Sequence, residues 1–180
     1  MKASELIIRH AVAKDQAYIF ELFKAVSKNI GGIARQEDEI TMDYVTRNLT
    51  QSMQNGVCLV IEHPQKEKGF LAQIHCYKLE PRVFSHVLSE LTIVVHPDYH
   101  SKGLGKKLFM AMIEYVEKNR KDIMRIELIA RESNQKAIKL YQSIGFCVEG
   151  KMEKRICTSP GVLEADIPMA WFNKNFQPNK

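Results

Sequence analysis

The sequence has little of what marks membrane, secreted or zinc-binding proteins. Its longest apolar runs, such as Val57–Ile61, fall far short of the ~20 residues that a membrane-spanning helix needs. The first residues contain no apolar stretch of the kind that a signal peptide carries. We therefore expect a soluble, cytoplasmic protein that makes no contact with a membrane.

Metal-binding and disulfide patterns are also missing. The four cysteines form no Cys-x-x-Cys motif and stand mostly in apolar surroundings, which favours buried, reduced thiols. His96 and His100 are four residues apart, but Pro97 between them disfavours the continuous helix that a zinc-binding pair requires. The sequence therefore predicts no metal.

The composition is that of one folded globular domain. Of the 180 residues, 45% are apolar and 26% are charged, and there is no internal repeat or Pro/Gly/Ser-rich linker. A chain of this length buries enough surface to fold without disulfides or metals. We therefore treat residues 1–180 as a single domain.

Positive charge is concentrated in one third of the chain. The formal net charge is +5, and the segment 101–155 alone holds thirteen basic and seven acidic residues. Such an excess suits an anionic ligand, although it also suits a solvated helix face. Because aromatic residues do not alternate with the basic ones, the pattern does not favour nucleic-acid binding.

In the first half of the chain, the periodicity predicts one strand and two helices before a set of three strands. The strand covers 6–11, and the first helix follows Asp15 as its N-cap and ends before Gly31-Gly32. The second helix runs from about Gln36 to Met53, with acidic residues in its first turn. The expected buried positions of these helices are Ile19, Leu22, Phe23, Val26, Ile40, Tyr44, Val45 and Leu49. Short polar connections join strands at 57–62, 70–79 and 86–96, which is typical of an antiparallel meander.

In the second half, helices and strands alternate. A helix starts after Gly103, a strand follows at 124–130, and a second helix covers 134–144 with Gly145 at its C′ position. The buried side chains expected on that second helix are Ala137, Leu140, Tyr141 and Ile144. The segments 146–156 and 165–172 close the fold as a hairpin, in which Pro168 indicates an edge or a bulge. The fold class is α+β, with a mixed, mostly antiparallel sheet flanked by helices.

The most informative segment is the loop between the third meander strand and the next helix. It reads Tyr99-His100-Ser101-Lys102-Gly103-Leu104-Gly105-Lys106. Glycines let a backbone approach a ligand closely, and a helix N-terminus offers N–H groups to an anion, so the loop suits a pyrophosphate. The loop matches neither the ATP-type P-loop nor the dinucleotide fingerprint. Taken alone, it could be no more than a tight turn with a helix cap.

A second segment gives this loop a context. It runs from Asn134 through Ala137, Leu140 and Tyr141 to Gly145-Phe146. The two segments resemble the Arg/Gln-x-x-Gly-x-Gly/Ala motif and the Asn…Ala…Leu-Tyr…Gly-Phe segment of the GCN5-related N-acetyltransferase (GNAT) family. The order of predicted elements is similar to that family over nearly the whole chain. His100 departs from the pattern, since the family usually has Arg or Gln there, and we expect a modest loss of phosphate contact.

The resemblance implies a GNAT-like acyl-coenzyme A N-acyltransferase fold with a splayed sheet, and acetyl-coenzyme A as acyl donor and co-substrate. It implies that the pantetheine arm pairs with the exposed edge of the strand at Ile93, Val94 and Val95. The implied contacts to the rest of the coenzyme are His100, Ser101, Lys102, Gly103, Leu104, Gly105, Lys106, Asn134, Ala137 and Tyr141.

The resemblance also implies the catalytic groups. Tyr141 would protonate the leaving thiolate, and Glu90 would remove a proton from the amine, directly or through water. Read from the residues alone, Tyr141 could be a core aromatic and Glu90 an ordinary surface glutamate. His75 and His96 are alternative bases, although each is more typical of a structural or rim histidine.

The resemblance implies an N-acetyltransferase that moves the acetyl group to a primary amine by direct attack in a ternary complex. A small-molecule amine is favoured, because the chain has no second module for reading a protein. The expected specificity elements are 30–39, with Gly31-Gly32 as a mobile wall, the strand 70–79 and the closing hairpin. Glu37, Asp38, Glu39 and Asp43 could attract a cationic amine or simply cap and solvate a helix. A non-catalytic acyl-coenzyme A sensor and a homodimer both remain open.

Overall fold

The computed structural model describes residues 6–28, 33–159 and 161–178. Its contacts divide the chain into two compact units, each built from two segments. The first unit holds residues 1–78 and 92–114, and the second holds residues 79–91 and 115–180. That the whole chain acts as one N-acetyltransferase domain stays a prediction.

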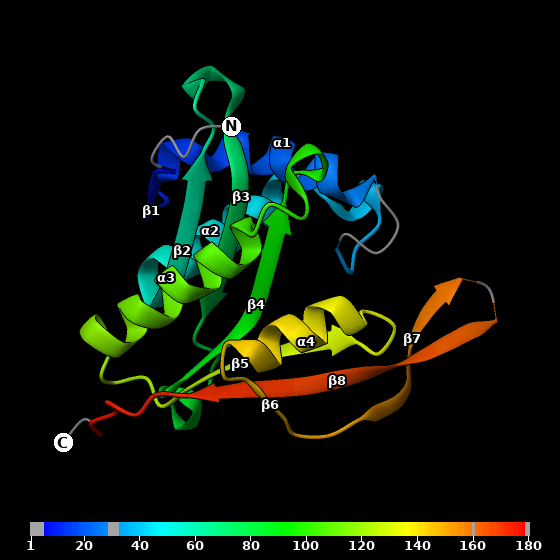
Figure 1. Ribbon diagram of the computed structural model, residues 1–180. Helices are drawn as coiled ribbons and strands as arrows, with labels where there is room; N and C mark the ends of the chain where they lie inside the picture. The colour runs from blue at the N-terminus through cyan, green and yellow to red at the C-terminus, as the bar shows by residue number, and fades with distance from the viewer. Residues whose placement is uncertain (1–5, 29–32, 160, 179–180) are drawn as a thin grey trace. The chain divides into compact units, whose positions relative to one another are not determined.

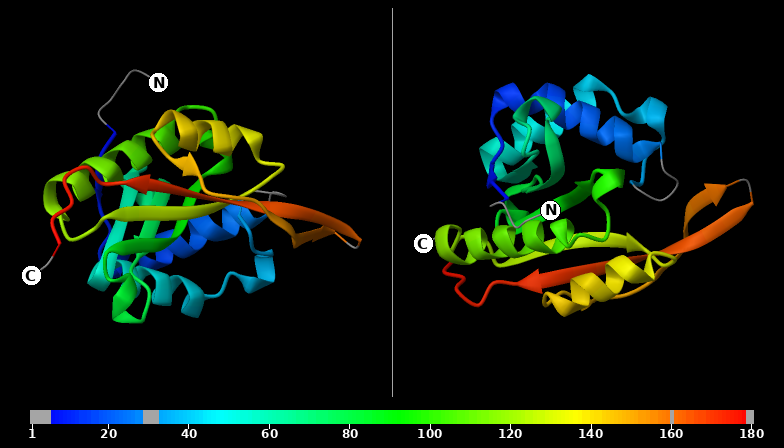
Figure 2. Two further views of the ribbon diagram at one scale, coloured as in Figure 1. Left: turned by 90° about the horizontal axis from the view of Figure 1, so that it is seen from below. Right: turned by 45° about the horizontal axis from the view of Figure 1, so that its top comes forward.

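In the first unit, helices lie on both faces of a small sheet (Figures 1 and 2). Its strand order is β1-β2-β3-β4, and the pairs β1–β2 and β2–β3 are antiparallel. Helices α1 and α2 pack against β2 and β3 on one face, and α3 crosses the other face. The elements are β1 (Ile8–His10), α1 (Gln16–Ser27), α2 (Met42–Asn55), β2 (Gly56–Glu62), β3 (Phe70–Tyr77), the end of β4 (Val87–Val95) and most of α3 (Leu104–Asn119).

The core of the first unit confirms the helical periodicity. The predicted stripe of α1 is buried, since Ile19, Leu22, Phe23 and Val26 are each at most 3% exposed. On α2, Val45 and Leu49 are buried as predicted, whereas Tyr44 is half-buried. Burying a side chain of this size contributes about 1.5–3 kcal/mol relative to leaving it in water. The whole cluster consists of Ala11, Ile19, Leu22, Phe23, Val26, Ile40, Val45, Leu49, Cys58, Val60, Phe70 and Val94.

The predicted start of the second helix is wrong. Glu37–Glu39 form a separate 3-10 turn, η2, and α2 begins only at Met42. Ile40 ends η2 in an extended conformation, and the side chain of Thr41 then accepts a hydrogen bond from the Tyr44 N–H as the N-cap of α2. Ile40 is buried in the core although it lies in the break between η2 and α2, so its burial does not require an α-helix at this position. The residues Gly31-Gly32 lie outside the described part of the chain.

In the second unit, the long strand β8 lies between its partners (Figure 1). β8 pairs antiparallel with β5 along one edge and with β6 and β7 along the other, and α4 lies over this sheet. The start of β4 pairs with β5 in parallel, at Val87↔Arg125 and Leu88↔Ile126. The remaining elements are β5 (Arg125–Arg131), α4 (Gln135–Ser143), β6 (Cys147–Val148), β7 (Met152–Ser159) and β8 (Val162–Phe172).

Pro168 explains why the closing hairpin is interrupted. It lies inside β8 opposite Ile129 of β5, so β8 is not an edge strand. On its other side, β8 changes partner from β6 to β7, and only the Pro168 carbonyl is used there, accepting from the Glu149 N–H at 2.9 Å. Proline has no N–H to donate, so a break between partners suits it. The edge alternative predicted for Pro168 is therefore wrong. The register with β5 runs through Pro168 without the shift that a bulge would cause.

Two further expectations in the second unit need correction. On α4 the buried residue is Ile138, whereas Ala137, Leu140, Tyr141 and Ile144 are only half-buried. Of the cysteines, Cys58 and Cys76 in the first unit are buried as predicted, but Cys147 and Cys157 are exposed. Both exposed residues stand on strands beside β8 whose side chains are mostly exposed, Cys147 on β6 and Cys157 on β7.

Gly145 confirms its predicted role after α4. Its φ of +99° is a left-handed conformation that strains any other residue, and a Cβ there would lie 3.3 Å from Cδ1 of Trp171. The chain therefore turns sharply from α4 into Phe146, which is buried.

Candidate active site

The predicted phosphate loop joins β4 to α3 within the first unit. After β4 ends at Val95, the 3-10 turn η5 covers Pro97–Tyr99, and α3 begins at Leu104. Two loop residues have left-handed backbones, Ser101 with φ +61° and Gly103 with φ +75°. A Cβ at Gly103 would meet nothing within 4 Å, so its backbone angle rather than lack of space favours glycine.

The first turn of α3 presents backbone donors. The helix makes its first i→i−4 bond from the Lys107 N–H to the Gly103 carbonyl, at 3.1 Å, so the N–H groups of residues 104–106 precede that bond. These groups and the positive end of the helix dipole form a site suited to an anion. A Cβ on Gly105 would lie 3.6 Å from the Ile93 side chain and 3.9 Å from that of Val95. The structure thus brings the end of β4 and the start of α3 together.

The side chains of the loop are more ordered than the sequence suggests. The ring of His100 bonds through Nε2 to the Val95 carbonyl oxygen at 2.8 Å. The Lys102 ammonium donates to the Asp98 carbonyl at 3.1 Å and lies over the Tyr99 ring. His100 therefore takes a local role where the family usually has Arg or Gln, and Lys106 and Lys107 extend as exposed cations from the helix start.

The burial of side chains along the end of β4 alternates only in part as predicted. Val94 is 1% exposed and belongs to the core, whereas Ile93 and Val95 are half-buried. Glu90 is exposed, but its φ of +52° departs from an extended strand. The alternation expected from Glu90 through Thr92 to Val94 is therefore broken at Glu90, in the manner of a bulge that re-aims one side chain.

The remaining predicted site residues lie on α4 and its N-cap, in the second unit. The Asn134 side-chain oxygen accepts from the Ala137 N–H at 3.1 Å, so Asn134 caps the helix. Tyr141 is half-buried, with its ring 6.1 Å from that of Phe146. Burial raises the pKa of Tyr141 to about 12. At neutral pH this side chain is a phenol, which can donate a proton but cannot act as a base.

Four basic residues of segment 101–155 form ion pairs with carboxylates, and three of these carboxylates belong to the same segment. Arg125 pairs with Glu149 at 2.6 Å, Lys151 with Glu132 at 2.7 Å, and Arg155 with Asp166 at 3.1 Å. Arg120 likewise contacts Asp122 at 2.9 Å. Only Asp166 lies outside the segment, so these pairs leave most of its net positive charge in place.

The alternative base His75 is a core residue. It is 2% exposed, and its Nδ1 contacts the Gln73 side-chain nitrogen at 3.0 Å. Its ring stacks between those of Phe23 and Tyr77, at centroid distances of 6.2 and 6.3 Å. Burial lowers the pKa of His75 to about 4. His96, the other alternative, is half-buried and caps η5 by accepting from the Asp98 N–H.

We predict that His75 makes the protein acid-sensitive. Below pH 6.5 the unfolded chain takes up a proton on this histidine, whereas the folded chain does so only near pH 4, so stability falls as the pH falls through this range. The expected loss at pH 5 relative to pH 7.5 is about 2 kcal/mol from this residue. Urea unfolding of the parent and of His75→Gln across pH 4.5–7.5 measures it. A variant with the same pH slope as the parent would contradict the assignment.

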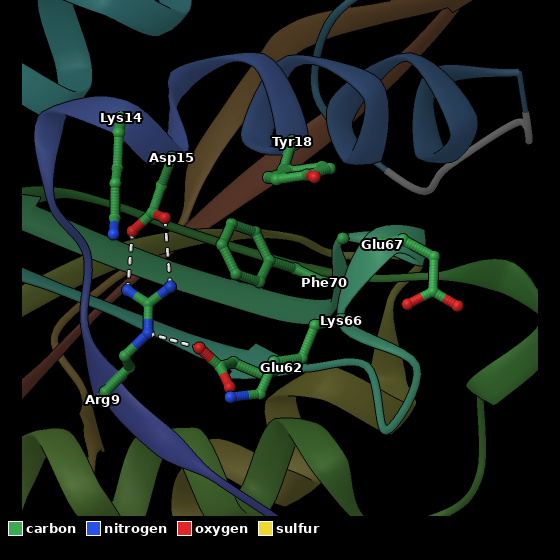
Figure 3. Close-up of a pocket in the computed structure, with 9 residues that line it drawn as sticks. Arg9, Lys14, Asp15, Tyr18, Glu62, Lys66, Glu67 and Phe70 are labelled. Atoms are coloured by element: carbon green, nitrogen blue, oxygen red, sulfur yellow. Dashed lines mark hydrogen bonds and ion pairs between the residues drawn. The ribbon is translucent and has the colours of Figure 1, made fainter.

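The sequence reasoning missed an ion-pair network beside a pocket of about 310 Å³ in the first unit (Figure 3). Arg9 donates to Asp15 from both terminal nitrogens, at 2.6 and 3.0 Å, and to Glu62 from Nε at 2.6 Å. Asp15 stands at the N-cap position of α1 as predicted, but its side chain makes no cap bond to that helix and instead accepts from the Val12 N–H at 2.8 Å. The bond from Arg9 to Glu62 joins residues 53 positions apart, so local spacing gave no signal for the network.

The Arg9 network governs the charge states of its members. Burial alone would raise the pKa of Asp15, but the hydrogen bonds from Arg9 and Val12 outweigh burial and leave it lowered. The hydrogen bond to Asp15 likewise raises the pKa of Arg9. The network therefore stays ionised and ties β1 to β2 and to the start of α1.

The described residues also bear on two other features, a metal site and a membrane-spanning helix. Over 6–28, 33–159 and 161–178, no three His, Cys, Asp or Glu side chains are grouped as a metal ion would need. In the same part of the chain, every helix is too short or too polar to cross a membrane.

Comparison with known proteins gives one consistent result. Residues 19–146 match the model of the acetyltransferase (GNAT) family. The chain is 30% identical over 95 residues to spermidine N(1)-acetyltransferase of Escherichia coli, covering 50% of each chain. It is 43% identical over 63 residues to the [ribosomal protein bS18]-alanine N-acetyltransferase of Escherichia coli, covering 33% of this chain and 41% of that one. The chain thus spans at most half the length of these curated relatives.

Solved structures show the same fold. The phosphinothricin acetyltransferase of Sinorhizobium meliloti, a GNAT superfamily protein in complex with acetyl-coenzyme A, superposes with a TM-score of 0.81 at 16% identity. The match covers 97% of this chain and 94% of that one. The α+β fold, with mixed, mostly antiparallel strand pairing and four α-helices among the described residues, is therefore the GNAT fold. Because the family model matches more than half of the residues of this chain, the chain belongs to the acetyltransferase (GNAT) family.

Proposed function

We propose that this protein is an acetyl-coenzyme A-dependent N-acetyltransferase that acts on the primary amine of a small molecule. The observation that carries the proposal is the loop before α3, where left-handed Ser101 and Gly103 lead into the helix start. The N–H groups of residues 104–106 precede the first intrahelical bond and suit a pyrophosphate. Family membership supports acetyl-coenzyme A as the molecule that carries this pyrophosphate.

The donor would lie along the end of β4 and the start of α3. The pantetheine arm would pair with the backbone of Ile93, Val94 and Val95, next to the loop in the first unit. The pyrophosphate would rest on 100–106, with Lys106 as a nearby cation. In the second unit, Asn134 and Ala137 are proposed to contact the coenzyme through the N-terminal turn of α4, although the Asn134 oxygen already caps that helix.

The reaction would be direct attack of the amine on the thioester carbonyl carbon. An alkyl ammonium with a pKa near 10.4 is almost fully protonated at pH 7, so a proton must leave first. We assign its removal to Glu90, directly or through water, because it is an exposed carboxylate whose backbone leaves the extended strand with a φ of +52°. As the C–N bond forms, backbone N–H groups near Val94 and Val95 would stabilise the negative oxygen.

The C–S bond then breaks, and the electron pair leaves with the sulfur. We assign Tyr141 as the acid that protonates this thiolate. The nitrogen loses its second proton to water and the phenolate regains a proton from water, which yields free coenzyme A and the acetylated amine. A phenol with its pKa raised to about 12 keeps its proton throughout the pH range in which the enzyme would work.

The acceptor is the least constrained part of the proposal. The similar proteins named above act, by their names, on spermidine and on a ribosomal-protein alanine. One of the acidic residues near η2 has a local role, because the Glu39 carboxylate accepts from the Gln36 N–H at 2.7 Å. Glu37, Asp38 and Asp43 are exposed carboxylates from which a cationic amine could gain attraction.

A free-thiol release assay tests the proposed function. Acetyl-coenzyme A is supplied with a panel of amines: amino acids, spermidine and a peptide with a free N-terminal alanine. We expect acceptor-dependent thiol release with at least one small amine. Coenzyme A binding without release across the panel would instead indicate a non-catalytic sensor, and release with the peptide alone would indicate a protein substrate.

A further inference from the structure

Tyr99 connects the phosphate loop to the distant β2–β3 connection. Its hydroxyl lies 2.8 Å from Nε2 of His63, a residue 36 positions earlier in the chain. The His63 N–H donates to the Gly69 carbonyl at 2.9 Å, which closes the base of that connection. Tyr99 and His63 thus join two turns of the first unit that the sequence keeps apart.

The His63 ring is held on both of its nitrogens. Nδ1 lies 3.0 Å from the Gln65 nitrogen and 3.1 Å from the Gln65 carbonyl oxygen. If Nε2 carries the proton, it donates to Tyr99 while Nδ1 accepts from the Gln65 N–H. If Nδ1 carries it, Nδ1 donates to the Gln65 oxygen and Tyr99 donates to Nε2. Either tautomer keeps the hydrogen bond to Tyr99.

The Tyr99 ring is enclosed by three polar groups. The rings of His63 and His96 meet it edge to face, at centroid distances of 5.8 and 5.7 Å. The Lys102 ammonium lies 4.4 Å from its centroid and also donates to the Asp98 carbonyl. A cation at this distance from an aromatic face is attracted to it, so Lys102 is drawn back over the loop.

The loop needs such support because its backbone is strained. Ser101, two residues after Tyr99, has a φ of +61°, which costs a residue with a Cβ about 1–2 kcal/mol. A strained segment persists only when its surroundings hold it. This segment is held by Tyr99 at one end and by the start of α3 at the other.

We propose that Tyr99, held by His63 and covered by Lys102, is a positioning residue that fixes the phosphate loop in the conformation that binds the pyrophosphate. This inference rests on the proposed function, since it assumes that the loop binds coenzyme A. The β2–β3 connection then sets the affinity for the nucleotide half of the donor and not for its pantetheine half.

Calorimetric titrations with coenzyme A, and with pantetheine as a ligand without pyrophosphate, test the inference. We expect Tyr99→Phe to raise the Kd for coenzyme A about fivefold to tenfold, because it deletes one hydrogen bond. The Kd for pantetheine and the kcat at saturating acetyl-coenzyme A should stay within twofold of the parent values. Tyr18→Phe removes the same oxygen from an exposed ring of the first unit and serves as the matched control.

Variants of His63, the hydrogen-bond partner of Tyr99, give a second test of the inference. His63→Ala should reproduce the Tyr99→Phe effect, the double variant should be no weaker than either single one, and His63→Gln, which keeps an amide near Nε2, should restore most of the affinity. A parent Kd in Tyr99→Phe, additive single effects, or equal losses with both ligands would overturn the inference. If the parent itself binds no coenzyme A, the proposed function fails together with it.

Discussion

Replacing Tyr141 by phenylalanine is expected to lower kcat about 100-fold while leaving the Kd for coenzyme A within twofold. Positioned acids and bases contribute typically 10²–10⁴-fold to a rate, and the substitution deletes only the acidic hydroxyl. Because the pKa of Tyr141 is raised to about 12, the parent should show no loss of kcat from this group up to pH 10. Steady-state thiol release with the best amine of the panel measures kcat, and calorimetric titration measures the Kd for coenzyme A.

The control for Tyr141→Phe is again Tyr18→Phe, an exposed tyrosine on α1 to which no catalytic role is assigned. It should leave kcat unchanged. A Tyr141→Phe protein with the parent kcat would remove Tyr141 from the mechanism, and a loss confined to coenzyme binding would make it a binding residue instead.

Replacing Arg9 by methionine is expected to lower the free energy of unfolding by about 3 kcal/mol. The substitution leaves Asp15, whose side chain is 4% exposed, and Glu62, at 16%, without their shared cation. Removing one partner of a buried ion pair typically costs 3–5 kcal/mol, and the partial exposure of Arg9, at 31%, places the effect at the lower end. Urea unfolding at pH 7 measures the change.

Two variants separate the Arg9 network from a general surface effect. Arg47→Met removes an exposed arginine of α2 and should change stability by less than about 0.5 kcal/mol. Adding Asp15→Asn to Arg9→Met should recover part of the loss, because the buried charge is then gone. A cost below about 1 kcal/mol for Arg9→Met would show that solvent compensates the carboxylates.

The parts of the fold that depend on local pattern could be read from the sequence. Helical stripes such as Leu22, Phe23 and Val26, the strands β2 to β5 and the glycine after α4 all follow from periodicity and backbone preference. The loop before α3 was also predictable, because its glycines and the following apolar stripe mark a strand-to-helix turn. The family match confirms the resemblance drawn from these segments.

The parts that depend on distant residues could not be read in this way. Asp15 looks like a helix cap locally, but its carboxylate accepts hydrogen bonds from Arg9 and from the Val12 N–H. The contact between Tyr99 and His63 joins turns 36 residues apart and leaves no periodic trace. The bend at Glu90 and the paired environment of Pro168 arise from neighbouring strands, which single-strand alternation does not reveal. Whether Glu90 and Tyr141 act as assigned stays a prediction.

The central claim is that the first turn of α3 binds the pyrophosphate of coenzyme A, and calorimetry on the full chain tests it most directly. Coenzyme A is titrated into the protein beside pantetheine, which keeps the thiol arm and lacks the pyrophosphate. The account predicts saturable heat at one site per chain with coenzyme A, and binding at least tenfold weaker with pantetheine. No heat with millimolar coenzyme A, or equal affinity for the two ligands, would contradict it.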